Sequence, residues 1–127
     1  MKKKICIVLA NYYPNISKNL LNGAILILKK NKILTYKKII APGVFEIPTI
    51  ISKNLSKYDG FISLGCVIKG QTPHFTFISK SSIDAIMNLS VKSKKPIGNG
   101  ILTCLNYKQA LSRSNPKQKD KGGEAAK

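Results

Sequence analysis

Metal-binding residues are scarce in this chain of 127 residues. It has one histidine, His74, and three cysteines, no two of which form a C-x-x-C pair. A zinc site needs three or four clustered His, Cys or carboxylate ligands, so we expect neither a bound metal nor metal catalysis. Each cysteine, Cys6, Cys66 and Cys104, lies in an apolar stretch. This placement predicts buried free thiols in a reducing compartment.

Long hydrophobic runs are also missing. No apolar run approaches the roughly 20 residues that a membrane-spanning helix needs. The N-terminal residues lack the apolar core and cleavage site of a signal peptide. We therefore expect a soluble cytoplasmic protein that does not bind membranes. Residues 1–127 fit one domain, which buries roughly two thirds of its unfolded surface on folding.

Acidic residues are few, and the chain is strongly basic. Five Asp and Glu stand against 22 Lys and Arg, which gives a formal net charge of +17. Such a charge is typical of nucleic-acid-binding domains. Here the lysines come in scattered clusters at the ends of apolar segments, among them Lys29-Lys30, Lys37-Lys38 and Lys94-Lys95. This pattern favours solvated surface lysines and no nucleic-acid partner, with a basic nucleic-acid module as the less favoured alternative.

Short apolar segments alternate with segments of helical periodicity. Strands are predicted at residues 4–10, 32–40, 61–68 and within 94–105. Helices are predicted from Ser17 as N-cap, over 49–57, from about Phe75 to Ser93 and from about Tyr107 to Ser112, with residues 41–48 as a loop. Strands that alternate with helices predict an α/β fold with a parallel sheet between two helical layers.

The last segment, residues 114–127, is polar and highly charged. Its composition predicts a disordered basic end, unless Glu124 to Lys127 begin a final helix.

The turn before the single histidine has the composition of an anion site. In Gly70-Gln71-Thr72-Pro73, Thr72 suits a helix N-cap and Pro73 the first helical position, which places His74 in the first turn. Free backbone N–H groups at a helix N-terminus bind phosphate well. The helix dipole lowers the pKa of such an imidazole and a bound phosphate raises it, so His74 is a candidate general acid and base. A purely structural histidine is the alternative.

Five motifs in order resemble one enzyme family. They are "APGVFEIP" at 41–48, "LGCVIKGQTPHF" at 64–75, "GILT" at 100–103, Arg113 and "KGGEAA" at 121–126. Together they resemble the 6,7-dimethyl-8-ribityllumazine synthases of riboflavin biosynthesis. The resemblance implies a flavodoxin-like three-layer α/β/α sandwich with a four-stranded parallel sheet. It also implies condensation of 5-amino-6-(D-ribitylamino)uracil with 3,4-dihydroxy-2-butanone 4-phosphate, without a cofactor.

The same resemblance implies an oligomer with its active sites between subunits. We expect a pentamer or a decamer rather than a 60-subunit shell, because the tail is short for the family and lacks the glycine-rich turn that often accompanies such shells. Riboflavin synthase is a candidate partner.

The resemblance also assigns roles to individual residues. It implies that His74 is the catalytic acid and base. Pyrimidine binding falls to Tyr12, Val44, Phe45, Glu46, Cys66, Val67, Ile68 and Asn99. Phosphate binding falls to Gln71, Thr72 and Arg113, with Lys121 and Glu124 as supporting residues. Cys66 is expected to act through its backbone and not as a nucleophile.

Asn99 departs from the family pattern. Many members carry an aromatic ring at this position, and its loss weakens pyrimidine binding by about 1 kcal/mol. This departure supports one alternative, a relative that binds a lumazine or flavin without turning it over.

Overall fold

Four parallel strands form the centre of the protein, in the order β2-β1-β3-β4. They are β1 (Ile5–Ala10), β2 (Tyr36–Ala41), β3 (Gly60–Ile68) and β4 (Ile97–Cys104). This computed structural model describes residues 4–33, 36–69 and 74–126, without the side chains of residues 74 and 75. The register pairs Ile5 with both Tyr36 and Gly60, so the first three strands begin at the same level.

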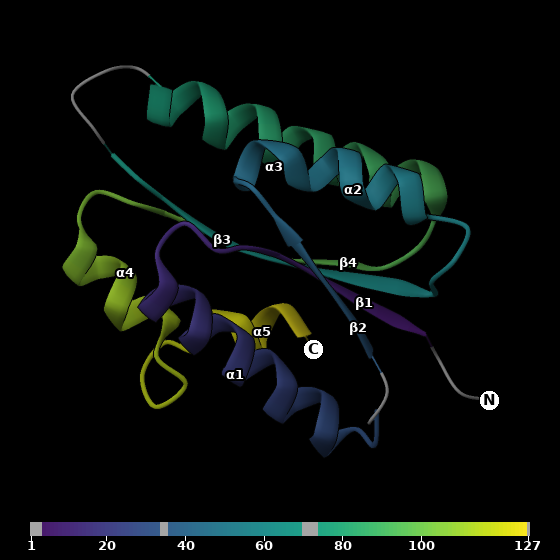
Figure 1. The fold of residues 1–127 in the computed structure, drawn as a ribbon, viewed down its shortest axis with the longest axis horizontal. Helices are drawn as coiled ribbons and strands as arrows, with labels where there is room; N and C mark the ends of the chain where they lie inside the picture. Colours follow the sequence, from purple (N-terminus) through teal and green to yellow (C-terminus); the bar gives the residue numbers. More distant parts are fainter. Residues whose placement is uncertain (1–3, 34–35, 70–73, 127) are drawn as a thin grey trace.

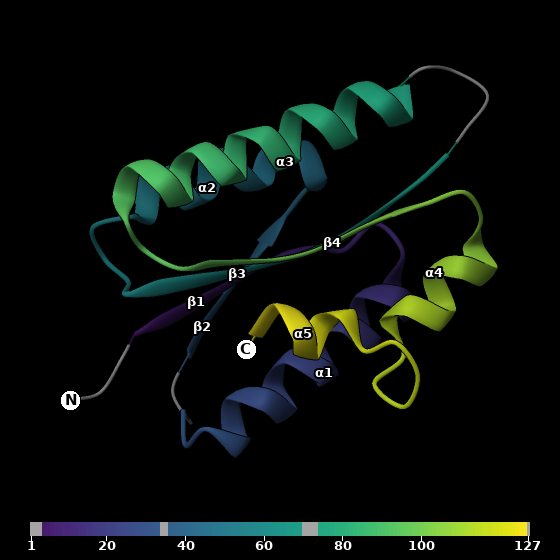
Figure 2. The ribbon, with the colours of Figure 1, turned by 180° about the vertical axis from the view of Figure 1, so that it is seen from behind.

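Helices cover both faces of the sheet (Figure 1). One face carries the short 3-10 helix η1 (Val44–Glu46) with α2 (Ile47–Asn54) and α3 (His74–Ser93). The other carries α1 (Pro14–Lys30), α4 (Tyr107–Ser114) and α5 (Lys121–Ala126), and the view from behind shows α5 beside α1 beneath the sheet (Figure 2). The predicted three-layer α/β/α architecture is confirmed.

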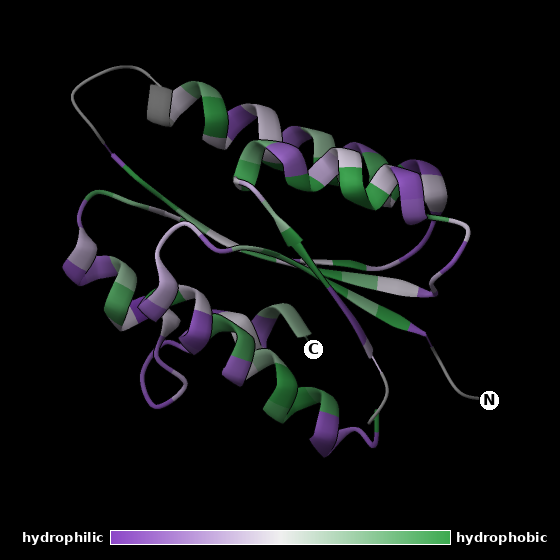
Figure 3. Ribbon diagram, viewed as in Figure 1, coloured by the Kyte–Doolittle hydropathy of each residue, from purple (hydrophilic) through white to green (hydrophobic). Residues whose placement is uncertain are grey.

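The central strands β1 and β3 are buried on both sides. Along β1, Cys6 and Val8 face the α2–α3 layer, whereas Ile7 and Leu9 face α1. A strand covered on both faces must be apolar at consecutive positions, as these strands are (Figure 3). The three cysteines lie free and buried in these two core layers, as predicted.

The first helix begins earlier than Ser17, so the predicted N-cap is wrong. Helix α1 starts at Pro14, with Tyr13 in extended conformation at the N-cap. Proline suits the first helical turn because its missing N–H has no helical partner there. Ser17 instead lies inside the helix, where its hydroxyl donates to the Ala10 carbonyl at 3.1 Å.

The C-terminal segment is ordered, which corrects the predicted disorder. Its helix α5 begins at Lys121, three residues before the alternative start at Glu124. Asp120 precedes it with φ of 46°, and its carboxylate accepts the Gly123 N–H at 3.1 Å. This carboxylate therefore caps the short helix.

Glycines allow α5 to lie directly against its neighbours. A Cβ on Gly122 would overlap the Leu20 carbonyl of α1, and a Cβ on Gly98 would overlap the Ala125 carbonyl. The backbones of α1, β4 and α5 therefore approach more closely than side chains would permit. Composition alone gave no sign of this packing, because it depends on glycines of two separate segments, β4 and α5.

The remaining elements agree with the predictions apart from their ends. Strand β3 and helix α3 lie where predicted, and α4 extends two residues further, to Ser114. Helix α2 begins at Ile47 and ends at Asn54, so it starts two residues and ends three residues earlier than the predicted range of 49–57. The predicted loop at 41–48 therefore contains η1 and the first turn of α2.

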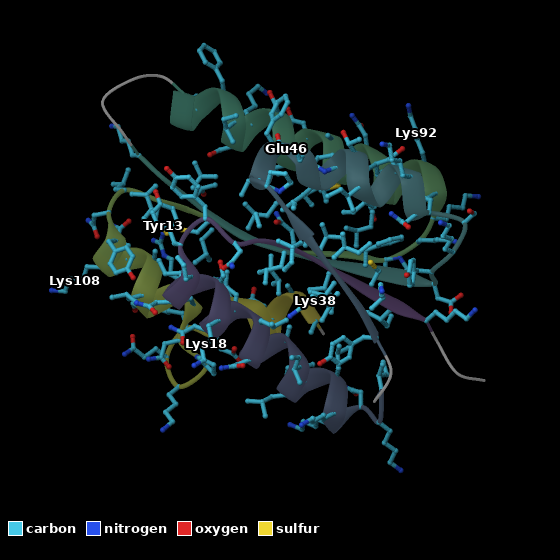
Figure 4. The ribbon with its side chains drawn as sticks, viewed as in Figure 1. Tyr13, Lys18, Lys38, Glu46, Lys92 and Lys108 are labelled. Carbon is cyan, nitrogen blue, oxygen red and sulfur yellow. The ribbon has the colours of Figure 1, made fainter. Side chains whose placement is uncertain are left out.

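One lysine predicted to be solvated is structural. Lys95 is half-buried, and its ammonium group donates to the carbonyls of Leu55 and Tyr58, the latter at 2.9 Å. These carbonyls lie at the end of α2 and in the turn that follows. Elsewhere, Lys18, Lys92 and Lys108 point outward from different helices (Figure 4), as expected of solvated lysines.

We predict that Gly122→Ala lowers the free energy of unfolding by roughly 1 to 3 kcal/mol, because the added methyl group overpacks the α1–α5 contact. Urea denaturation followed by circular dichroism measures the change. Gly43→Ala is the control, since its Cβ would meet only the flexible Glu46 carboxylate, at 3.2 Å. Equal stability of both variants would contradict the close packing of α5.

We also predict that Lys95→Met lowers the free energy of unfolding by roughly 1 to 3 kcal/mol, because two carbonyl groups lose a charged donor. Lys80→Met is the matched control. Its ion pair with Asp84 spans 3.1 Å between side chains that are 76% and 61% exposed. Loss of such a surface pair changes stability by about 0.5 kcal/mol or less. The same denaturation experiment compares the two, and a Lys95→Met effect no larger than that of Lys80→Met would be the contrary result.

Candidate active site

The order of the strands creates a crevice at one edge of the sheet. The chain passes from β1 outward to β2 and then returns to the other side of β1 to form β3. In open α/β sheets, ligands bind beyond the carboxyl ends of the strands where the order reverses. Here that place lies beyond Ala10 and Ile68, the last residues of β1 and β3.

A cavity of about 510 Å³ lies at this place. It is bounded by the segments that follow β1 and β2 and by the end of β3. Its walls contain seven of the predicted pyrimidine-binding residues: Tyr12, Val44, Phe45, Glu46, Cys66, Val67 and Ile68. Segments far apart in the sequence thus meet around one cavity, and its volume suits a small organic molecule.

An exposed aromatic ring lies at the edge of this first cavity. The Tyr12 ring is 72% exposed. The ring of Tyr13 contacts it edge-on, with 4.9 Å between ring centroids. Tyr13 in turn lies 6.3 Å from the ring of Tyr107 on α4. The Tyr12 ring is therefore supported from one side and leaves a face free to stack on a planar ligand.

The opposite wall carries a carboxylate. Glu46 is the N-cap residue of α2, yet its side chain makes no capping hydrogen bond. Its carboxylate oxygens are therefore not used by the backbone of that helix. Figure 4 shows Glu46 at the start of α2 and Tyr13 beside the end of β1, on the loops that enclose the cavity. Such a carboxylate can accept hydrogen bonds from hydroxyl groups of a ligand.

The thiol in this cavity is not reactive. Burial, together with the neighbouring Cys104, raises the pKa of Cys66 to about 12. A thiol that stays protonated at neutral pH is a poor nucleophile. Burial likewise raises the pKa of Tyr13, whose phenol keeps its proton and can donate a hydrogen bond. The raised pKa values of Cys66 and Tyr13 agree with a cavity that binds its ligand without forming a covalent bond to it.

A second cavity, of about 370 Å³, lies where α5 meets β4. Its walls contain Asn99, Arg113, Lys121 and Glu124, all of them predicted site residues, together with residues 100–103. Lys121 and Glu124 form an ion pair at 3.2 Å on α5. The Asn99 side-chain carbonyl accepts the Ile101 N–H at 3.0 Å, so its amide NH₂ group remains available.

The two cavities share no wall residue. The structure therefore brings the predicted site residues together as two groups, and it does not bring Arg113, Lys121 or Glu124 to the cavity of Tyr12. Gln71, Thr72 and the side chain of His74 lie outside the described residues. The helix α3 begins at His74 and runs for 20 residues, so a full helix dipole points its positive end toward this position.

Four residues of the first cavity were not predicted, and two of them, Pro42 and Gly43, directly precede the predicted Val44. Tyr13 and Ile78 line it beside the predicted residues. Tyr13 could have been found, since it directly follows Tyr12 in the same strand-to-helix loop. Ile78 lies in the second turn of α3, and nothing in its sequence context distinguishes it from a core residue.

Neither a metal cluster nor a membrane span is found in the part of the chain that the structure describes. No three His, Cys, Asp or Glu side chains come together there as a metal site would require. No helix among the same residues is long and apolar enough to cross a membrane.

Comparison with known proteins identifies the family. Residues 2–127 match the family described as 6,7-dimethyl-8-ribityllumazine synthase. The protein of that name from Bartonella tribocorum is 44% identical over 131 residues, which cover 99% of this chain and 86% of its own. That from Agrobacterium fabrum is 43% identical, with 99% and 89% covered, and that from Buchnera aphidicola is 42% identical, with 96% and 80% covered. The chain therefore belongs to the 6,7-dimethyl-8-ribityllumazine synthase family.

Proposed function

We propose that this protein condenses 5-amino-6-(D-ribitylamino)uracil with 3,4-dihydroxy-2-butanone 4-phosphate to give 6,7-dimethyl-8-ribityllumazine, phosphate and water. Membership of the lumazine synthase family supports this reaction. The observation that carries it in the structure is the first cavity, which is lined by the exposed Tyr12 ring and by Glu46, whose carboxylate makes no capping hydrogen bond. A planar pyrimidine with a polyhydroxyl side chain fits that combination.

In the pyrimidine half of the site, each group has a separate task. The Tyr12 ring stacks on the pyrimidine, and Glu46 accepts hydrogen bonds from the ribityl hydroxyls. Strand β3 ends at this cavity, and the backbone of residues 66–68 reads the edge of the pyrimidine. Val44 and Phe45 complete the apolar wall. The protonated Cys66 thiol takes no covalent part.

Phosphate binding and proton transfer fall to the N-terminal end of α3. Gln71 and Thr72 bind the phosphate ester with the help of the helix dipole. The substrate amine attacks the ketone, and loss of water gives an imine. Removal of a proton then allows phosphate to leave, and ring closure with loss of a second water gives the lumazine. His74 accepts and returns these protons, while Arg113 and Lys121 balance the charge of the phosphate.

We further propose that the active form is a homo-oligomer, a pentamer or a multiple of it, with each site formed by two subunits. The two cavities of one chain share no wall residue, so a complete site needs the second cavity of a neighbour. One face of α3 exposes Phe77, Met87 and Val91 by 66%, 62% and 68%. The outer edge of β2 also lacks a partner strand among the described residues. Both surfaces are suited to subunit contacts.

We place this activity in the cytoplasm, where three unpaired thiols remain reduced. Riboflavin synthase, which uses the lumazine product, is a candidate partner.

Mixing the purified protein with both substrates tests the reaction. We expect the fluorescent lumazine to form well above the uncatalysed rate, and His74→Ala to slow it roughly 10- to 1,000-fold, because proton transfer is lost. Lys30→Ala, an exposed position in the last turn of α1 that lines neither cavity, should leave the rate unchanged. Lumazine that binds without any acceleration of its formation would instead indicate the non-catalytic relative.

Complementation between two inactive variants tests the shared site. We expect co-expressed His74→Ala and Arg113→Ala subunits to regain about a quarter of wild-type activity, because one interface in four then joins two intact halves. Native mass spectrometry of the same sample reports the number of subunits. Activity no greater than that of either variant alone would place both residues in the site of one chain.

A further inference from the structure

The three buried thiols occupy different places relative to the site. Cys104 is the last residue of β4 and is fully buried beneath α1, with Cys66 in the same core layer. The register pairs Cys104 with Ile68, two residues after Cys66 on β3. Cys6 lies in the core layer on the opposite face of the sheet. Cys104 thus lies beside Cys66, which lines the first cavity, whereas Cys6 lines neither cavity.

Cys104 contacts the arginine of the second cavity. The Nη1 group of Arg113 donates to the Cys104 sulfur at 3.6 Å. Within the described parts of the chain, this is the single hydrogen bond found for the guanidinium group, and Arg113 forms no ion pair there. Glu124, which lines the same cavity, is instead paired with Lys121 at 3.2 Å. The thiol is therefore the polar group that orients Arg113.

A thiol suits this task better than a carboxylate would. Guanidinium carries five N–H donors in a rigid plane, and bidentate phosphate binding uses two of them. A carboxylate partner would neutralise the charge and compete with the phosphate. Sulfur is a weak acceptor, so it fixes the direction of one N–H and leaves the charge and the other donors free. Because the Cys104 side chain is fully buried in the core, its sulfur keeps a fixed position.

We propose that Cys104 is a positioning residue that holds the Arg113 guanidinium in the orientation that grips the substrate phosphate. The inference deepens the proposed function and rests on the phosphate-binding role given there to Arg113. Cys104 itself contacts no substrate.

Steady-state kinetics of the full-length assembled enzyme test this role. We expect Cys104→Ala to raise the KM for the butanone phosphate and the inhibition constant of inorganic phosphate roughly 3- to 10-fold, since one orienting hydrogen bond is lost. The KM for the pyrimidine should remain unchanged. Cys104→Ser, which keeps an acceptor, should restore most of the affinity. Cys6→Ala, also a buried thiol, should leave both KM values at the wild-type level.

A double-mutant cycle separates orientation from general loosening of the core. In the Arg113→Ala background, Cys104→Ala should change the phosphate inhibition constant by less than about twofold, because the group it positions is absent. A full 3- to 10-fold effect in that background would overturn the proposal. So would equal increases of both KM values, or no change in Cys104→Ala alongside a clear effect of Arg113→Ala.

Calorimetric titration with inorganic phosphate keeps the inference testable without turnover. If the wild-type protein forms no lumazine, the proposed reaction fails, but phosphate affinity still reports on Arg113 and Cys104. Weaker binding in both single variants would support the positioning role. Unchanged binding in Arg113→Ala would remove that role together with the phosphate function of the arginine.

Discussion

Burial of the central strands on both faces is the constraint on which the rest of the structure depends. Strands β1 and β3 contribute apolar side chains to two separate core layers. Helices must therefore cover both faces, and each connection between two parallel strands must run over one of these faces through a helix. This arrangement brings the loops after β1 and β2 and the end of β3 to one edge, where the first cavity forms.

The excess of positive charge serves several local purposes rather than one. Lys95 ties the end of α2 to the connection between α3 and β4 through backbone carbonyls, while Lys18, Lys92 and Lys108 point into solvent on different sides. Arg113 and Lys121, by contrast, line the second cavity. A net charge of +17 therefore says little about a binding surface until each cation is placed, because charge at scattered positions produces no focused field.

Much of the fold could be predicted from sequence, but the assembly of the site could not. The apolar run of β3 and the periodicity of α3 indicate their elements directly. The start of α1 was missed because Ser17 has the chemistry of an N-cap, although Pro14 sets the first turn. Helix α5 was foreseen only as an alternative to disorder, and with a start three residues too late, because it packs on Gly98 and Leu20, contacts that no local pattern reveals. The separation of the two cavities likewise depends on tertiary packing.

The small size of α5 has a consequence for how activity and stability are related. The helix contains two glycines and two alanines, so its docking buries little apolar area and relies on close backbone contact. Elements with few buried apolar groups open locally at a lower free energy than the sheet. Lys121 and Glu124 would leave the second cavity in such an opening while β1 and β3 stayed paired. The protein can thus lose a half of its site without losing its fold.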